Sequence, residues 1–357
     1  MGASLWFAAR VAAVVLGAVA LLWQPSAEWI EHAYANGGYA SWEHVAYAIT
    51  SPFPWSLGDL AVGIGIAAIV WRIVVFVRAR TWRSISAVGV LLLDIAAIVG
   101  LYAIWFEVSW GWNYARAPIE ARTAFDATRV TPAAAAKLSA RALRQINSLA
   151  AAAHARANLP LDYDALRGAW LPAVQRAGDE WMPLVSSAKP TIFNPFMEAT
   201  GTSGFVNPLT LTTQLAGDVL WFERPFDQSH EWSHVAAYAR EDEANYLAIV
   251  TCLRSPDPVM RYSGWLELFL YLPQKPHYAR REFSPLVWQD FIALRRRDAH
   301  HINVLLAHWT WRTYNVYLKS NRIASGIANY NEVTRLILGV PLDAQGLPEV
   351  KASAGPL

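Results

Sequence analysis

The chain has 357 residues, of which 54% are hydrophobic and only 16% are charged, and its formal net charge is +2. This composition is more apolar than that of an average soluble domain, and 18 tryptophans suit a chain that meets membrane–water interfaces. The small net charge gives no large field that would attract nucleic acid, so we expect no nucleic-acid partner. The single cysteine, Cys252, excludes an internal disulfide and a zinc site built from cysteines.

Three long apolar runs lie in the first third of the chain, at about residues 5–23, 57–77 and 85–106. Each has roughly the 17–25 residues that an α-helix needs to cross about 30 Å of hydrocarbon. The first run is long and no clear small-residue cleavage site follows it, which favours an uncleaved span over a signal peptide. We therefore predict a membrane region over residues 1–107 with three transmembrane helices, and the lipid bilayer as a partner.

Basic residues indicate how these spans are oriented. Four arginines lie at or near the short turn between the second and third spans: Arg72, Arg78, Arg80 and Arg83. The positive-inside rule places such a turn in the cytoplasm. We therefore expect residues 24–55, and everything after Phe106, on the extracytoplasmic side.

One acidic residue, Asp94, lies near the middle of the third span. A carboxyl group is costly in hydrocarbon, so it is either functional, as in a transport protein, or neutral or paired between packed helices. Arg10 in the first span is one possible partner. Three spans are few for a transporter, and we favour the structural interpretation.

Residues 108–345 are predicted to form a largely helical extracytoplasmic domain with a small edge sheet, so the fold class is mainly α with some β. Thr131 and Pro132 are typical of a helix start, and the alanine-rich run after them should be helical to about residue 157. Further helices are expected over about 164–181, 243–254, 259–272, 284–319 (as one helix or two) and 331–338. Residues 182–208 are predicted to be mainly loop. Residues 209–214 alternate between apolar and polar side chains, as in a short strand, and a peptide could add to the edge of that strand. Residues 346–357 should form a loose tail.

The chemistry is concentrated in residues 225–248, PFDQSHEWSHVAAYAREDEANYLA. His230 and His234 stand four residues apart, so they project from the same face of an α-helix. Two imidazoles in that arrangement can bind one Zn²⁺, and Glu231 is placed to act as a general base toward water. With 9 histidines in the chain, this pattern is expected by chance only about 0.01 times. The plainer alternative is an ordinary helix face with two hydrogen-bonded histidines.

A tetrahedral zinc site with two histidines needs a third protein ligand, and the acidic cluster at residues 241–243 offers one. In a straight helix, Glu243 would lie about 13 Å from His234. The chain must therefore turn near residues 238–240, although no glycine or proline marks the turn. Asp242 and Asn245 are candidates for hydrogen bonds to the histidines.

An acyl-transfer site also needs a donor toward the developing oxyanion. Tyr262 is our candidate for that catalytic role, with Tyr246 or His277 as alternatives. Each of these side chains is more often structural than catalytic.

Several stretches carry a resemblance to a known family. They are KPTIFNPFMEATGTSGF (189–205), HEWSH (230–234), AREDEANYLA (239–248), WGWNYARAPIEAR (110–122), RYSGW (261–265) and YLKSNRIASGIANY (317–330). Together they resemble a bacterial membrane family, domain of unknown function 3810. The resemblance implies a membrane-anchored, zincin-like metallopeptidase in which His230, Glu231 and His234 match the metal motif.

The resemblance also bears on the third ligand. The E-A-N run is similar to the third-ligand segment of the glutamate zincins, which implies Glu243, and Glu241 is the fallback. In the family, a small or aliphatic residue usually stands where this chain has Trp232, so we expect a different groove wall here.

These expectations combine into one function hypothesis. The protein would be a multi-pass zinc metallopeptidase of the bacterial cytoplasmic membrane that cleaves a peptide or protein substrate on the extracytoplasmic side. His230, His234 and Glu243 would hold Zn²⁺, and Glu231 would take a proton from water and pass it to the leaving amine. The alternative is a non-catalytic zincin-like sensor or binding protein of the cell envelope.

Overall fold

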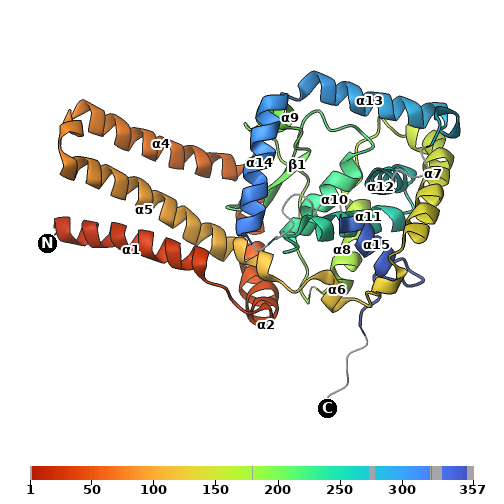
Figure 1. The fold of residues 1–357 in the computed structure, drawn as a ribbon, viewed down its shortest axis with the longest axis horizontal. Coiled ribbons are helices and arrows are strands. Elements are labelled where there is room, and N and C mark those ends of the chain that lie inside the picture. Colours follow the sequence, from red (N-terminus) through yellow and green to blue (C-terminus); the bar gives the residue numbers. More distant parts are fainter. Residues whose placement is uncertain (1, 179, 273–277, 322, 324–331, 352–357) are drawn as a thin grey trace, which may run out of the picture.

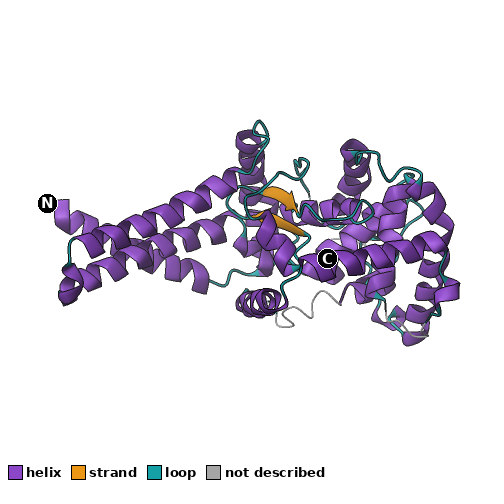
Figure 2. Cartoon of the chain, turned by 90° about the horizontal axis from the view of Figure 1, so that it is seen from above, coloured by secondary structure: helices purple, strands orange, loops and turns teal. Residues whose placement is uncertain are grey.

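The structure is a computed structural model that describes residues 2–178, 180–272, 278–321, 323 and 332–351. Three long helices extend side by side from one end of a rounded, mostly helical domain (Figure 1). One two-stranded sheet lies inside that domain, close to the bases of the long helices (Figure 2). The predicted mainly helical class with a small sheet is confirmed.

The three long helices are α1 (Gly2–Leu22), α4 (Leu57–Arg78) and α5 (Ile85–Ser109). All three are long and apolar enough to cross a membrane, as predicted. Helices α1 and α5 pack closely because glycines face each other. A Cβ atom at Gly17 would lie 2.6 Å from Gly100 Cα, and one at Gly100 would lie 2.4 Å from the Ala13 carbonyl oxygen. Small residues at such contacts are a common means of packing helices in lipid.

Asp94 is paired rather than isolated. Its Oδ1 atom lies 2.7 Å from Arg10 Nε of α1, and its Oδ2 atom accepts a hydrogen bond of 2.8 Å from Arg72 Nε of α4. The Asp94 side chain is buried between the helices. The expected partner Arg10 is confirmed, Arg72 is an additional one, and a single carboxylate joins all three membrane-length helices.

The segment between α1 and α4 is helical and packs against the outer domain. It consists of α2 (Ala27–Trp29), the π-helix η1 (Ile30–Tyr39) and α3 (Ala40–Thr50). Residues of η1 share a buried cluster with Phe106 and Trp110, which lie at and just after the end of α5. This cluster fixes the outer domain to the ends of the long helices.

The outer domain begins with short elements and two longer helices. These are η3 (Gly111–Ala115), α6 (Ile119–Arg122), η4 (Ala127–Arg129), α7 (Pro132–His154), α8 (Tyr163–Arg176) and α9 (Asn194–Thr200). As predicted, the Thr131 hydroxyl caps α7 by accepting from Ala134 N at 3.1 Å. Helix α8 ends five residues before the predicted residue 181, ahead of Gly178, whose φ of +131° a helix cannot accommodate.

The remaining helices are α10 (Arg224–Val235), α11 (Glu241–Arg254), α12 (Pro258–Tyr271), α13 (Pro285–His301), α14 (Val304–Ser320) and α15 (Val333–Gly339), with the short turns η2 (Thr81–Arg83) and η5 (Arg280–Glu282). Residues 284–319 form two helices because the chain extends at Ile302 and Asn303. The Asn303 side chain then caps α14 by accepting from Leu306 N at 3.0 Å. Within the predicted tail, residues 352–357 lie outside the described part of the chain.

The sheet consists of β1 (Gly204–Asn207) and β2 (Thr212–Leu215), which run antiparallel with Gly204 opposite Leu215. The predicted strand at 209–214 starts later, because Leu211 adopts a left-handed φ of +51° in the turn. Lys189 N donates to Thr213 O at 2.8 Å and so covers the outer side of β2. Among the described residues, no strand pairs with the other side of β1, so β1 is the edge strand.

The main hydrophobic core surrounds α10 and α11. Trp170 of α8 and Trp232 of α10 are fully buried, and their ring centroids lie 5.6 Å apart. The Trp232 indole N–H also donates to Ser186 O at 2.7 Å. The expectation that Trp232 forms a groove wall is therefore wrong, because this side chain points into the core.

Candidate metal centre

Helix α10 brings the two histidines of the motif together. Pro225 lies in its first turn, where a missing N–H costs no hydrogen bond, and all residues from Pro225 to Val235 are buried. His230 and His234 are one turn apart, and their Nε2 atoms are separated by 3.1 Å. Two imidazole nitrogens therefore meet at one point beside the helix.

The turn predicted after His234 is present and begins at Ala236. Ala237 has a left-handed φ of +67°, its N–H donates to His234 O at 3.0 Å, and Tyr238 N–H donates to Ser233 O at 3.0 Å. These two bonds define a Schellman cap, here with alanine where glycine is usual. The chain is extended at Arg240, and α11 begins at Glu241. The cap thus reverses the chain, so that the acidic first turn of α11 lies near the two histidines.

Glu241 completes a group of three ligand atoms. Its Oε2 atom lies 3.3 Å from His230 Nε2 and 3.5 Å from His234 Nε2. With metal–ligand bonds of about 2.0–2.2 Å, the corners of a regular tetrahedron are about 3.3–3.6 Å apart. Within the described residues, these three side chains are also the group whose atoms converge closely enough to hold a metal ion. The donor set and its spacing fit Zn²⁺.

Other side chains orient these ligands. His234 Nδ1 lies 2.7 Å from Tyr238 O, so it donates there and leaves Nε2 free as a ligand. Tyr314 of α14 donates its hydroxyl to Glu241 Oε1 at 2.5 Å. Glu241 Oε2 is buried and faces the two imidazole Nε2 atoms, as expected of an oxygen that would share a cation with them. Asn245 lies beside His230 and opposes only weakly the lowering of the His230 pKa by burial.

The three ligands influence each other's protonation. Burial would raise the pKa of Glu241, but His234 and His230 hold it well below its usual range. Burial likewise disfavours the charged form of His234, but Glu241 outweighs it and raises the pKa of that imidazole to about 9. For His230, burial prevails and lowers the pKa. A cation that binds here must therefore displace a proton from His234.

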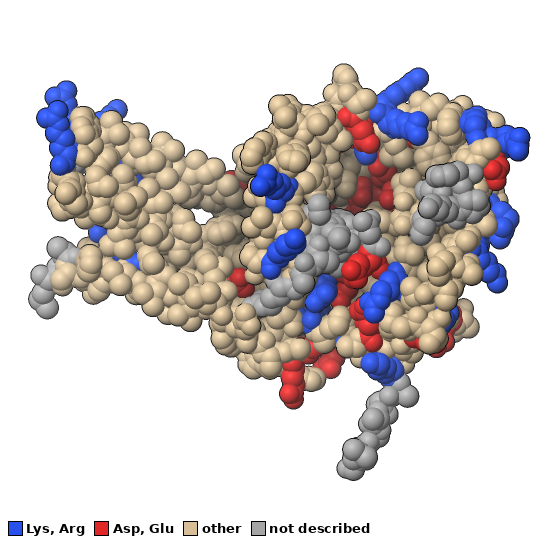
Figure 3. Space-filling model, viewed as in Figure 1, with Lys and Arg blue, Asp and Glu red and all other residues tan. Residues whose placement is uncertain are grey.

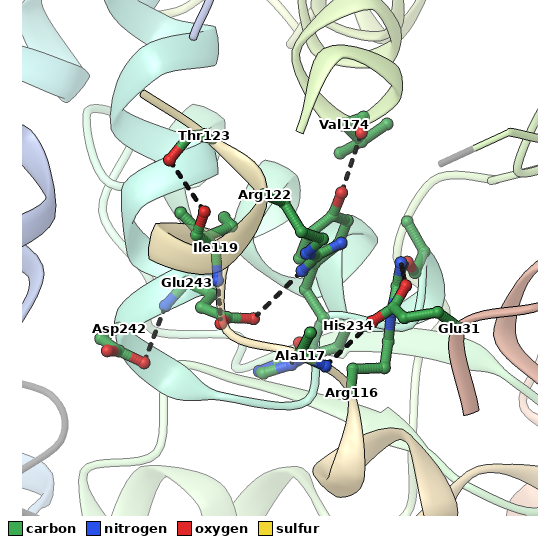
Figure 4. A network of polar contacts seen from close by, with 12 residues as sticks. Glu31, Arg116, Ala117, Ile119, Arg122, Thr123, Val174, His234, Asp242 and Glu243 are labelled. Carbon is green, nitrogen blue, oxygen red and sulfur yellow. Dashed lines mark hydrogen bonds and ion pairs between the residues drawn. The ribbon is translucent and has the colours of Figure 1, made fainter. Parts of the chain in front are cut away.

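Glu243, the first choice for the third ligand, lies elsewhere. Its Oε1 atom accepts a hydrogen bond of 2.9 Å from Ile119 N, and its Oε2 atom lies 3.9 Å from the Arg122 guanidinium (Figure 4). Asp242, the other candidate for supporting the histidines, accepts from Glu243 N at 3.0 Å. Because α11 starts at residue 241, positions 241 and 243 point in different directions from its first turn. The geometry therefore favours the fallback, Glu241.

Glu231 lies next to the ligand group and against the edge strand. Its side chain is buried, and a Cβ atom at Gly204, the first residue of β1, would lie 2.2 Å from Glu231 Oε1. Burial raises the pKa of Glu231 to about 8, although the charge of His234 opposes this. A bound dication would favour the carboxylate form. The residue thus combines a position beside the ligands with a pKa in the range of a general base.

A stripe of acidic side chains extends from Glu231 along α10. Glu223, Asp227 and Glu231 follow at four-residue intervals on α10, so they share one helix face. Figure 3 shows a hollow between α13 and α14 with acidic side chains inside it. Asp227 accepts from Ser203 Oγ at 3.3 Å, and Arg297 of α13 pairs with Glu223. Sequence reasoning missed this stripe, although the four-residue spacing was visible.

A family model described as "Protein of unknown function (DUF3810)" matches residues 34–338, which is most of the chain and includes the whole candidate centre. The chain belongs to this family. No curated protein and no solved structure gives a significant match. The predicted family is confirmed, and its description assigns no activity, so function must be argued from the site.

The DUF3810 match includes the segment after α5, and this segment caps the C-terminal end of α10. The last carbonyl groups of a helix lack partners within it. Here Trp110 Nε1 donates to His234 O at 3.3 Å, Tyr39 donates to Val235 O at 2.8 Å, and Arg116 donates to Ala236 O at 3.3 Å. The membrane-proximal segments thus hold the end of α10 that carries His234.

Arg116 extends this network to the loop between the first two long helices. Its guanidinium pairs with Glu31 of η1 at 3.1 Å and lies 4.9 Å from the centre of the Tyr238 ring (Figure 4). Burial would raise the pKa of Glu31, but Arg116 and Arg122 outweigh it and lower the value. A positive charge at the C-terminus of α10 also complements the helix dipole. No local sequence signal could have predicted these contacts, because they join residues far apart in the chain.

Tyr262, the first candidate for the oxyanion donor, is engaged by another carboxylate. The Tyr262 hydroxyl donates to the Asp290 carboxylate, beside His154 and Trp221. Tyr246 is buried, and its hydroxyl has no partner among the described residues. His277 lies outside the described residues. For Tyr262, a structural role with Asp290 accounts for what is seen.

Proposed function

We propose that this protein is a membrane-anchored zinc metallopeptidase that hydrolyses peptide bonds on the extracytoplasmic side. The observation that carries the proposal is the spacing of His230 Nε2, His234 Nε2 and Glu241 Oε2, at 3.1–3.5 Å. Three buried ligands from two helices, joined by a tight cap, support a preorganised zinc site rather than a chance cluster.

The chain's own residues supply the remaining chemistry. When bound, zinc supplies a Lewis acid that acidifies water and polarises a carbonyl group. Glu231 would take a proton from the attacking water and return it to the leaving nitrogen. Strand β1 starts at Gly204 against Glu231, and no strand of the described residues pairs with its other edge. An extended peptide could therefore pair with this edge and pass over the base.

Charge and the position of the domain support the orientation that we propose. Arg78, Arg80 and Arg83 lie where α4 joins α5. Basic side chains gather at the tip of the long helices away from the outer domain (Figure 3). If that tip is cytoplasmic by the positive-inside rule, the domain with the metal centre is extracytoplasmic. Protease accessibility in intact cells and in inverted membranes would test this.

Metal content tests the site directly. We expect purified protein to contain one zinc per chain by elemental analysis, and His230→Ala to lose it. His300→Ala replaces an exposed histidine outside the ligand group and should keep the metal. Equal zinc in all three proteins would reject the site.

Turnover is tested separately with Glu231→Gln. This variant should retain zinc, because Glu231 is not a ligand, and should lose cleavage of a peptide library by at least about 100-fold, the usual contribution of a general base. Unchanged cleavage by Glu231→Gln would defeat the mechanism.

The second candidate is a zincin-like sensor or binding protein without turnover. The burial of the centre favours it, because the side chains of His230 and His234 are only 11% and 9% exposed. A zinc-loaded wild-type protein that binds peptides but cleaves none would support this function over proteolysis.

A further inference from the structure

Helix α14 lies at the side of the outer domain that faces the long helices. Its axis runs across their direction in Figure 1, and in Figure 2 it is seen close to end-on beside their bases. If α1, α4 and α5 cross a bilayer, α14 lies parallel to its surface. A helix in this position can lie in the membrane–water interface.

The inward face of α14 packs onto the domain and its metal centre. The Trp311 indole N–H donates to Thr200 O at 3.2 Å, Tyr314 donates to Glu241 Oε1 at 2.5 Å, and Leu318 is fully buried. At about 100° per residue, positions 311, 314 and 318 fall within one third of the helix circumference. This face fixes how α14 is rotated.

The opposite face is apolar and exposed. Leu305, Trp309 and Val316 are 75%, 61% and 63% exposed. They occupy a separate arc of the same helix, which also contains Arg312, whose guanidinium lies 5.7 Å from the centre of the Trp309 ring. Large apolar side chains with interspersed cations are typical of helices that lie on lipid surfaces.

The ends of the long helices mark the level of the interface. Trp23 follows α1, Trp55 precedes α4 and Trp105 lies near the end of α5, and these indoles are 40%, 46% and 41% exposed. Tryptophan prefers the headgroup region, so this ring marks the outer boundary of the hydrocarbon. Helix α14 lies at this same end of the outer domain, so its exposed apolar arc would extend the ring if it faces the bilayer.

We propose that α14 is an in-plane membrane helix whose Leu305, Trp309 and Val316 side chains enter the outer leaflet. The occupant of this apolar face is the lipid bilayer. Through Tyr314, the same helix holds the carboxylate of Glu241, so lipid contact positions a residue of the metal centre. This inference requires neither zinc nor catalysis, and its test is independent of both.

The test uses the full-length chain in lipid nanodiscs with a dye on a single introduced cysteine. The variants are Leu305→Cys and Val316→Cys on α14, and Arg281→Cys in η5 as the control, because α13 begins at the end of the domain away from the long helices (Figure 1). The native Cys252 is buried, and burial raises the pKa of its thiol to about 12, so it should not react in the folded protein.

Lipids with a nitroxide on the acyl chain report contact with the leaflet. We expect them to quench the dyes at positions 305 and 316 by about two-fold or more, as for side chains buried in the acyl boundary, and to leave position 281 unchanged. Dyes at 305 and 316 that are open to aqueous quencher instead would overturn the proposal. Dyes shielded from both quenchers, in a protein that runs as a dimer, would assign the face to a second copy of the chain and also overturn it.

Discussion

Glu241 and Glu243 lie two residues apart on the first turn of α11 but face different environments. Glu241 meets two imidazoles, whereas Glu243 meets the backbone of Ile119 and the Arg122 guanidinium. We expect Glu241→Gln to weaken zinc binding by more than about 100-fold, the upper range for losing an outer-shell contact, because it removes a ligand. Glu243→Gln should keep the metal. Competition with a zinc chelator measures both affinities, and the reverse order would return the third ligand to Glu243.

Gly204 makes a second prediction at the residue scale. A methyl group there would meet Glu231 Oε1 at 2.2 Å, so the carboxylate must shift. Because displacing a catalytic group by about 1 Å can cost about 100-fold, we expect Gly204→Ala to lower kcat by about that factor. Zinc content should not change. Gly168→Ala, where a Cβ atom meets nothing within 4 Å, is the matched control. Full activity in Gly204→Ala would show that β1 does not confine the base.

At the scale of elements, the long helices depend on close backbone contact. Any side chain at Gly100 would collide with the backbone carbonyl of Ala13, which cannot move aside as a flexible side chain could. We expect Gly100→Val to separate α1 from α5 and to lower the thermal midpoint of the protein in detergent. Gly89→Val, on the same helix with nothing within 4 Å of its Cβ position, should have little effect. Similar midpoints for the two variants would contradict the packing described here.

The elements of the metal centre also show how much the sequence could predict. The spacing of the two histidines predicted helix α10. The turn after α10 was predictable because a straight helix would carry the acidic residues away from the histidines. The choice between Glu241 and Glu243 could not be made, because it depends on Ile119 and Arg122, which reach α11 from about 120 residues upstream. Tyr314 was missed for the same reason, since it lies 73 residues after Glu241.

For the whole molecule, the three membrane-length helices and the helical outer domain were predictable because long apolar runs have few alternatives in water. Strand β1 was not predicted, since four residues beginning with glycine carry no clear alternation and gain their structure from pairing with β2. The helices between α1 and α4 were also missed. Their apolar residues are buried by Phe106 and Trp110, which come more than 60 residues later in the chain.

The stability of the whole protein should fall as pH rises through neutrality. Glu43 of α3 is buried and accepts from Leu184 N at 3.2 Å, and burial raises its pKa to about 8. The unfolded chain releases this proton near the ordinary glutamate pKa of 4.5, whereas the folded chain keeps it until about pH 8. Between these pH values the unfolded form therefore binds fewer protons than the folded form. The free energy of unfolding falls by on the order of 3–5 kcal/mol over this range.

Thermal melting between pH 5 and pH 8 measures this dependence. The midpoint of the wild type should fall across the range, and Glu43→Gln should reduce the slope because glutamine does not titrate. Glu28→Gln, an exposed position in α2, is the control and should keep the wild-type slope. Parallel curves for wild type and Glu43→Gln would show that the carboxyl is already ionised in the folded state.

The Asp94 carboxylate, shared by Arg10 and Arg72, bears on how the protein is made. Helices α1 and α4, which carry the two arginines, are synthesised first, and their counter-ion Asp94 is present only after α5 has been synthesised. Until then, α1 and α4 each carry an unpaired arginine in or near the bilayer, and this charge makes their insertion less favourable. Insertion should therefore be completed cooperatively, with the last helix securing the two that were synthesised before it.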